Sequence, residues 1–242
     1  MYDLHCHIIP GIDDGARDMQ EALALLQIAE QEGISHMVIT PHINPGHFDN
    51  TSSIIQQGLS ELKAASKNAG LQIQLAAAAE VRLSTEILTW AERDMLPFIG
   101  SYQGFHVLLL EFPHSHIPAG SDKLVKWLLS KNILPMIAHP ERNRDVQSDP
   151  AKLAPFIRLD CLFQLTASSV LGDMGERSTA LSVQLLKQKL FHVMATDSHN
   201  LLRRPPKLKQ AAQQVSELVS ADYAEQLVLQ MPKQISEVLF AG

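Results

Sequence analysis

The chain has 242 residues and a formal net charge of −6 at pH 7. Broad nucleic-acid binding depends on clustered Lys and Arg, so this acidic balance argues against a nucleic-acid partner. No apolar run approaches the roughly 20 residues that cross a bilayer, and functional-looking histidines from residue 5 onward leave no room for a signal peptide. We therefore expect a cytoplasmic protein without membrane insertion.

Two cysteines, Cys6 and Cys161, are too few for a disulfide framework or a zinc finger. Neither is followed by arginine six residues later, so the usual cysteine-phosphatase signature is absent. Both are expected to be free thiols.

Short apolar runs alternate with segments of helical period, a pattern typical of parallel strands joined by helices. The first helix is predicted between its N-cap Asp18, with Glu21 three residues later, and Gly33, and Ser121 is predicted to cap a later helix. The predicted strands lie near residues 2–5, 36–40, 73–79, 106–110, 133–138, 161–165 and 191–196. Further helices are predicted near 52–69, 84–94, 121–130, 150–157, 174–189, 207–219 and 222–239. Seven strands indicate an α/β barrel, with residues 1–242 as a single domain.

Loops after the strands build the site in parallel α/β folds, and six of the seven predicted strands end in a histidine or a carboxylate. The first ends in His5 and His7, whose spacing places both imidazoles on one side of a strand. The candidate ligands at the strand ends are His5, His7, His42, Glu80, Glu111, His139, Asp197 and His199. Such ligands suit zinc, manganese or iron, so a metal site is predicted at the C-terminal ends of the strands.

The remaining histidines fall into two groups. Three begin strands at the end opposite the predicted site and are interpreted as structural or surface residues: His36, His106 and His192. Three others lie in loops on the side of the site, where a role in substrate binding is open but less favoured: His47, His114 and His116.

Several short motifs carry a resemblance that extends over essentially the whole chain. They are His5-Cys-His7, Gly11-Ile-Asp-Asp-Gly15, Thr40-Pro-His42, Leu110-Glu-Phe-Pro113, His139-Pro-Glu-Arg142 and Thr196-Asp-Ser-His-Asn200. Together with Glu80 they resemble the polymerase and histidinol phosphatase (PHP) superfamily. Within it, the chain most resembles the bacterial manganese-dependent protein-tyrosine phosphatases encoded with capsule and exopolysaccharide systems.

The resemblance implies a distorted (β/α)7 TIM-like barrel that holds up to three metal ions, with Mn²⁺ expected and iron or zinc left open. By similarity, a first ion would take His5, His7, Glu80 and Asp197. A second would take Glu80, Glu111 and His139, and a third Asp14, His42 and His199. Either Asp13 or Asp14 could be the ligand from this turn, and Asp14 is favoured.

The implied activity is hydrolysis of protein phosphotyrosine through attack by a metal-bound hydroxide, with no covalent enzyme intermediate. Arg142 lies three residues after His139, and Arg204 five after His199. Arginine suits a phosphate dianion because it offers planar, bidentate donors. A surface ion pair is the alternative for either arginine, but their placement and the resemblance favour substrate binding, with Arg203 as the neighbour most easily confused with Arg204.

By similarity the phosphoprotein would be a bacterial tyrosine kinase, and homo-oligomer formation is open. Within the superfamily, the alternatives are a small-molecule phosphatase of the histidinol-phosphate type and a phosphodiesterase or nuclease. A metal-dependent amidohydrolase also begins with paired histidines but commonly has lysine where this chain has Glu111. A non-enzymatic scaffold is disfavoured, because all candidate ligands and both arginines are present.

Overall fold

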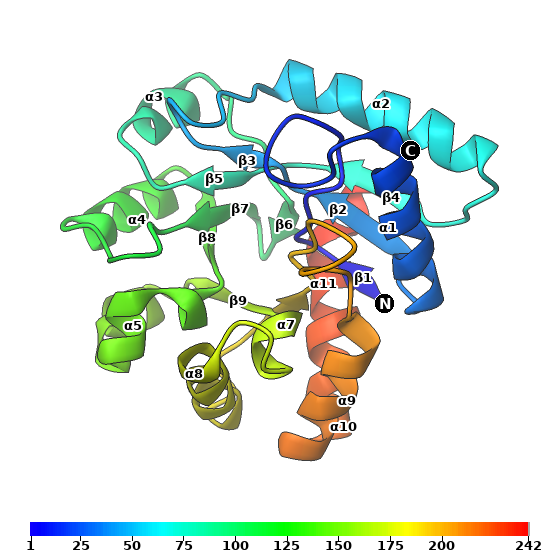
Figure 1. The fold of residues 1–242 in the computed structure, drawn as a ribbon. Helices are drawn as coiled ribbons and strands as arrows, with labels where there is room; N and C mark the ends of the chain where they lie inside the picture. The colour runs from blue at the N-terminus through cyan, green and yellow to red at the C-terminus, as the bar shows by residue number, and fades with distance from the viewer. Residues whose placement is uncertain (242) are drawn as a thin grey trace.

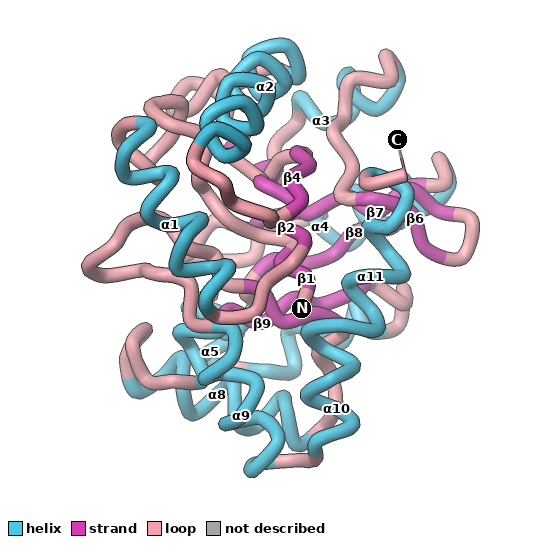
Figure 2. The backbone as a smooth tube through the Cα atoms, turned by 90° about the vertical axis from the view of Figure 1, so that its right-hand side faces the viewer, coloured by secondary structure: helices cyan, strands magenta, loops and turns pink. Residues whose placement is uncertain are grey.

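The computed structural model describes residues 1–241. Parallel strands occupy the middle of the molecule and helices surround them (Figures 1 and 2). One sheet has the order β1 (Tyr2–Asp3), β2 (His36–Ile39), β4 (Gln74–Ala77). The other has the order β10 (Val193–Ala195), β9 (Leu162–Thr166), β8 (Ile133–Ala138), β7 (Phe105–Glu111), β5 (Glu80–Arg82), β3 (His42–Ile43). The predicted α/β fold with parallel strands is therefore confirmed.

The segments that follow β1 and β10 lie side by side. Asp197 N donates to His5 O over 2.7 Å, and His7 N donates to Ser198 O over 2.8 Å. The buried carboxylate of Asp3 accepts hydrogen bonds from the backbone N and the hydroxyl of Thr196, while burial raises its pKa to about 6. Residues almost 200 positions apart are thereby joined, and they connect an edge of one sheet to an edge of the other.

The strands differ from the prediction in three places. The second predicted strand corresponds to β2, which ends before Pro41, a residue with no N–H for a ladder hydrogen bond, and β3 is a further strand beyond the predicted range. The third predicted strand corresponds to β4, and β5 is likewise a further strand that follows it. An unpredicted strand, β6 (Gly100–Tyr102), pairs antiparallel with β7 through a two-residue turn. Both turn residues, Gln103 and Gly104, have positive φ, as a type I′ hairpin requires.

Six predicted helices are present: α1 (Met19–Gln31), α2 (Ser52–Asn68), α3 (Glu86–Glu92), α4 (Ser121–Ser130), α8 (Glu176–Lys187) and α9 (Leu208–Leu218). Asp18 caps α1 by accepting a hydrogen bond from Glu21 N, as predicted. The predicted cap of α4 is wrong. Gly120, with φ of 85°, is the N-cap, and Ser121 is the first helical residue, whose hydroxyl donates to Pro118 O.

Two predicted helices are interrupted, and proline lies in each. The first, predicted near 150–157, forms η2 (Pro150–Leu153) and α6 (Ala154–Ile157). The C-terminal region forms α10 (Ala221–Glu225), a π-helical turn η3 (Gln226–Gln230), α11 (Met231–Ser236) and η4 (Glu237–Leu239). Proline lacks the N–H that continues a helix and crowds the preceding turn, which accounts for the π-helical turn before Pro232. The short helices α5 (Arg144–Ser148) and α7 (Ala167–Val170) and the turn η1 (Pro140–Arg142) were not predicted.

The apolar side chains form two layers. The outer layer lies between the strands and the surrounding helices, and the inner one fills the space that the strands enclose. Met231 and Ile235 of α11 belong to the inner layer. Gly100 allows this helix to approach, because a Cβ atom there would lie 1.9 Å from Ile235 O. Among the described residues, no helix combines the length and apolar character needed to span a bilayer.

Candidate metal centre

Strand alternation points the candidate ligands into the interior. On β7, Val107 and Leu109 belong to the inner layer, so Glu111 continues the same face. From β4 into β5, Ala76 and Ala78 are likewise inner residues, and Glu80 follows them in register. Apolar side chains thus fill one end of the interior and polar side chains occupy the C-terminal end.

His139 departs from this alternation. It follows the inward-facing Ala138, and its φ of 31° lies in the left-handed region. The altered backbone direction lets the imidazole approach Glu80, with Nε2 2.8 Å from Oε1. Asp197 also has a left-handed φ, of 51°. Such conformations in buried residues cost free energy and are concentrated at functional sites.

The structure brings all nine predicted ligands together. Four overlapping groups have donor atoms within 4.8 Å of one another: His7, Asp14, His42 and His199; His5, His7 and Glu80; His5, His139 and Asp197; and His42, Glu80 and Glu111. Compared with the sets implied by the resemblance, His7 joins the third set and His42 approaches the second. His42 therefore lies between two groups.

The donors around His5 are spaced like the ligands of one ion. Its Nε2 lies 3.2 Å from His7 Nε2, 3.3 Å from Glu80 Oε2 and 3.4 Å from Asp197 Oδ1. Ligands about 2.1 Å from an ion at tetrahedral or octahedral angles are separated by about 3.0–3.4 Å. These residues therefore fit a divalent cation.

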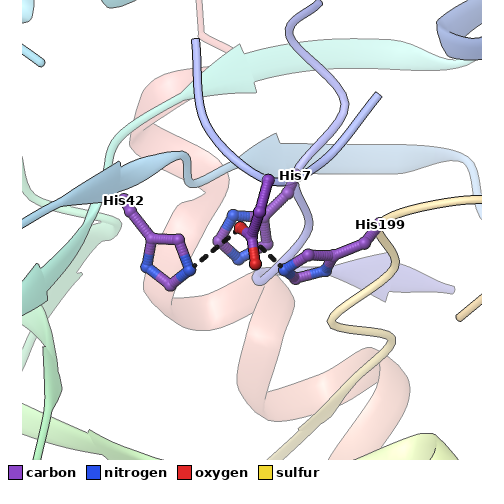
Figure 3. A group of neighbouring side chains, drawn as sticks. His7, His42 and His199 are labelled. Atoms are coloured by element: carbon purple, nitrogen blue, oxygen red, sulfur yellow. Dashed lines mark ion pairs between the residues drawn. The ribbon is translucent and has the colours of Figure 1, made fainter. Parts of the chain in front are cut away.

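A second group surrounds Asp14, whose Oδ1 lies 3.3 Å from His42 Nε2 and 3.4 Å from His199 Nε2. Figure 3 shows His7, His42 and His199 turned toward one another, with dashed lines marking the ion pairs that His42 and His199 make. These three histidines come from the segment after β1, from β3 and from the segment after β10. Asp14, rather than Asp13, lies among them.

Several buried polar atoms in this cluster have no hydrogen bond within the described part of the chain. They are His42 Nδ1, Glu80 Oε2, Glu111 Oε2 and His199 Nε2. His42 Nδ1 and Glu80 Oε2 are 2.9 Å apart but lack hydrogen-bond geometry. Buried polar groups normally have a partner, because leaving one unpaired is costly. Cations would satisfy these atoms together.

The carboxylates carry strongly shifted pKa values. Burial alone would raise the pKa of Glu80, but neighbouring histidines, His5 foremost, hold it well below its usual range. Asp197 is likewise buried, and the charge of Arg204 helps to hold its pKa low. By contrast, burial and the charge of Glu80 raise the pKa of Glu111 to about 7. A cation would favour the ionised form of all three.

The candidate histidine ligands differ in the direction of their pKa shifts. Burial and the charge of Arg142 lower the pKa of His139 to about 3, and burial lowers that of His199 to about 4. Burial also acts to lower the pKa of His42, but Glu80 raises it to about 9. Metal ligation requires a neutral imidazole. His139 and His199 are therefore neutral in advance, whereas ligation by His42 would release a proton.

One buried amide was missed in the sequence because its strand ends in neither histidine nor carboxylate. Gln164 on β9 accepts a hydrogen bond from His5 Nδ1 over 2.9 Å and one from His139 N over 3.3 Å. This assigns the proton of His5 to Nδ1 and leaves Nε2 facing the other donors. A partner on the outer ring nitrogen commonly orients metal-binding histidines.

The two predicted arginines converge on one carboxylate oxygen. Arg142, in η1, and Arg204 both pair with Asp197 Oδ2, Arg204 over 2.5 Å. A third arginine, Arg82, lies with Nε 3.0 Å from Glu111 Oε2. It was missed, although its position two residues after Glu80 on β5 was the available signal.

A cavity of about 190 Å³ opens above this cluster. Besides ligand candidates and the three arginines, it is lined by Asn44, His47, Phe48 and His114. Of the three loop histidines left open in the sequence, His47 and His114 therefore lie at the site, and His116 is not part of the lining. The histidines interpreted as structural lie elsewhere. His36 stacks on Tyr2, His106 stacks on Phe98, and His192 accepts a hydrogen bond from Phe163 N.

The fold and the cluster together define an α/β protein with parallel strands whose His, Asp and Glu donor atoms are grouped closely enough to hold metal ions. At the level of the fold alone, it resembles an organophosphorus hydrolase from Deinococcus radiodurans, with a TM-score of 0.57 at 16% identity over 99% of this chain and 92% of that one. The chain belongs to the CpsB/CapC family of capsular polysaccharide synthesis, whose sequence model matches residues 1–237.

Individual relatives agree with this membership. The chain is 31% identical to the tyrosine-protein phosphatase YwqE of Bacillus subtilis over 84% of this chain and 79% of the relative. It is 34% identical to the putative tyrosine-protein phosphatase CapC of Staphylococcus aureus over 87% of this chain and 81% of the relative. A solved structure from a study of YwqE and of CpsB from Streptococcus pneumoniae, described as metal-dependent tyrosine phosphatases, has a TM-score of 0.88 at 28% identity and covers 99% of this chain and 94% of that one.

Proposed function

We propose that this protein is a metal-dependent protein-tyrosine phosphatase. The observation that carries the proposal is the convergence of Arg142 and Arg204 on Asp197, a residue whose other carboxylate oxygen faces His5 and His7. Phosphate-binding groups and metal-binding groups thus share one cavity. The relatives named as tyrosine phosphatases support the same activity.

Bound divalent ions would lower the pKa of coordinated water toward about 7 and offset charge on phosphoryl oxygens. The nine clustered residues would hold them: His5, His7, Asp14, His42, Glu80, Glu111, His139, Asp197 and His199. We propose up to three ions, with Glu80 shared between two, because Glu80 takes part in two of the donor groups. Mixed imidazole and carboxylate donors suit manganese, iron and zinc alike, so we propose Mn²⁺ on the resemblance alone, with iron or zinc as alternatives.

The arginines would bind and orient the phosphate. Arg204 Nε is buried and makes no hydrogen bond within the described chain, so it offers a free donor to a phosphoryl oxygen. Asp197 fixes both guanidinium groups, which reduces the entropy lost when substrate binds. Arginine's rigid fork matches phosphate geometry, and this match gives the pair its specificity.

His114 is a candidate to donate a proton to the leaving group. Partial desolvation and the charges of Arg142 and Arg82 lower the pKa of His114 to about 4, although 51% of its side chain is exposed, so its imidazole is neutral at pH 7. It is then a poor proton donor. A phenol has a pKa of about 10, so phenolate leaves with less assistance than an alkoxide. Weak proton donation by His114 would therefore matter less for phosphotyrosine than for an alkyl phosphate.

We further propose that the phosphoprotein is a bacterial tyrosine kinase that controls capsular or exopolysaccharide synthesis, and that the reaction takes place in the cytoplasm. The family's description and the tyrosine-phosphatase relatives support this partner. We also leave open that this protein forms a homo-oligomer. The alternative is a small-molecule phosphatase or a phosphodiesterase with the same metal site.

The test is phosphate release from a phosphotyrosine peptide, histidinol phosphate and bis(p-nitrophenyl) phosphate. The purified protein is assayed before and after chelation, and with Mn²⁺, Fe²⁺ or Zn²⁺ restored separately. We expect chelator-sensitive release from the peptide, restored best by Mn²⁺ and lost in Arg142→Ala. Turnover of either other substrate without turnover of the peptide would overturn the tyrosine-phosphatase assignment.

A further inference from the structure

The cavity has one apolar side chain among the described residues that line it, Phe48. Every other lining residue is charged or carries an imidazole or amide. A phosphate bound by arginines and metal ions explains the polar lining. It does not explain an aromatic ring at the same opening.

The position of Phe48 is determined by a short hairpin after β3. Asn44 N donates to Phe48 O over 3.0 Å, and Phe48 N donates to Asn44 O over 2.8 Å. The ring stacks on His42 with centroids 5.4 Å apart and an interplanar angle of 8°. The ring of His47 lies at 62° to it, with centroids 4.4 Å apart. Phe48 is only partly buried, so part of its surface is available to a ligand.

Burial distinguishes the floor of the cavity from its mouth. Glu80, His139 and Asp197 are buried, whereas His47 and His114 are exposed. The volume of about 190 Å³ is close to the roughly 150 Å³ that holds a single benzene ring. With a phosphate at the floor, the group esterified to it must therefore extend to the mouth, beside Phe48.

We propose that Phe48 is the specificity-determining residue that selects aryl phosphates, by packing against the aromatic ring next to the phosphate. This inference rests on the proposed function, since it names the part of the site that recognises the phenyl group of phosphotyrosine. Pairs of aromatic rings attract beyond simple area burial. We expect Phe48 to contribute about tenfold to the binding of an aryl ligand and almost nothing to that of a methyl ligand.

The test uses two non-hydrolysable probes, phenylphosphonate and methylphosphonate, titrated by calorimetry into Mn²⁺-loaded protein. Phe48→Ala should weaken phenylphosphonate about tenfold and leave methylphosphonate unchanged. Phe48→Leu should give an intermediate loss, and Phe48→Tyr should bind like the wild type. The matched control is Phe105→Ala, because Phe105 is also partly buried but lies at the other end of β7 from Glu111.

Because Phe48 stacks on His42, bound manganese is measured on each preparation. The ratio of the two dissociation constants does not depend on metal occupancy. An unchanged ratio in Phe48→Ala, or an equal loss for both probes, would overturn the inference. Absence of phosphate release from a phosphotyrosine peptide by the wild type would overturn the proposed function instead, since the calorimetric ratio requires no turnover.

Discussion

His7 Nδ1 lies 2.7 Å from Asp13 Oδ2, so the carboxylate of Asp13 accepts a hydrogen bond from the ring N–H and leaves His7 Nε2 facing the other candidate ligands. The same carboxylate accepts hydrogen bonds from His42 N and Gly15 N. Its neighbour Asp14 faces His42 and His199. The two adjacent acids therefore have different tasks, one orienting ligands and the other lying among them.

Asp13→Asn should weaken metal binding about 10- to 100-fold, because the charge that orients and polarises His7 is lost. Calorimetric titration of the metal-free protein with Mn²⁺ measures this. Asp18→Asn is the matched control, since asparagine caps a helix as well as aspartate does. Equal affinities in the two variants would show that Asp13 does not act through His7.

Arg142→Lys and Arg204→Lys should each lower kcat/KM for a phosphotyrosine peptide by at least about tenfold. Lysine keeps the positive charge but loses the planar fork that binds two oxygens at once. Steady-state kinetics with restored metal measure the change.

Arg203→Lys is the control for the arginine variants, because Arg203 is exposed and does not line the cavity. Its kcat/KM should match the wild type. If Arg203→Lys were as defective as Arg204→Lys, the loss would come from the loop and not from phosphate binding.

Gly15→Ala should disturb His7, because a Cβ atom at residue 15 would lie 2.0 Å from His7 O and 2.6 Å from His7 Cβ. Such crowding against backbone typically costs about 1–3 kcal/mol of unfolding free energy. Thermal unfolding with and without Mn²⁺ should show lower stability and a smaller stabilisation by the metal.

Gly46→Ala provides the comparison for Gly15→Ala. Gly46 has φ of 77°, which disfavours alanine, but a Cβ atom there would meet nothing within 4 Å. It should cost stability by about 1 kcal/mol without changing the stabilisation by Mn²⁺. An equal loss of metal stabilisation in both variants would contradict the proposed contact.

Glu141→Gln should change how stability depends on pH. Burial raises the pKa of Glu141 to about 7 from a usual 4.5, while its Oε1 accepts hydrogen bonds from Thr166 N and the hydroxyl of Ser169. The folded protein therefore binds a proton that the unfolded chain has lost between these pH values. The stabilisation from protonated Glu141 is fully present below about pH 4.5. As the pH rises through 7 this stabilisation is lost, and the free energy of unfolding falls by roughly 3 kcal/mol.

Glutamine can accept the same hydrogen bonds but has no charge to bury. Urea unfolding at pH 5 and pH 8 should therefore show that the variant gains stability relative to the wild type at the higher pH. Parallel pH dependence of the two proteins would contradict burial of an ionisable Glu141.

Much of the site was predictable because a strand has a two-residue period. His5 and His7 could be paired from their spacing, and Glu111 from its place at the end of an apolar run. Arg82 could have been found in the same way, two residues after Glu80. The interruption of the C-terminal helix was harder to predict from the sequence, because the apolar periodicity continues through Pro232 while the regular backbone hydrogen bonds do not.

By itself, the sequence determined the α/β class, the strand ends that bear ligands and the family resemblance, because these depend on local period and on short motifs. Tertiary structure alone decided which donor atoms are grouped together, that Gln164 orients His5 across 159 residues, and that Phe48 lines the cavity. These contacts depend on strand register and loop geometry between distant segments, and no spacing within one segment encodes them.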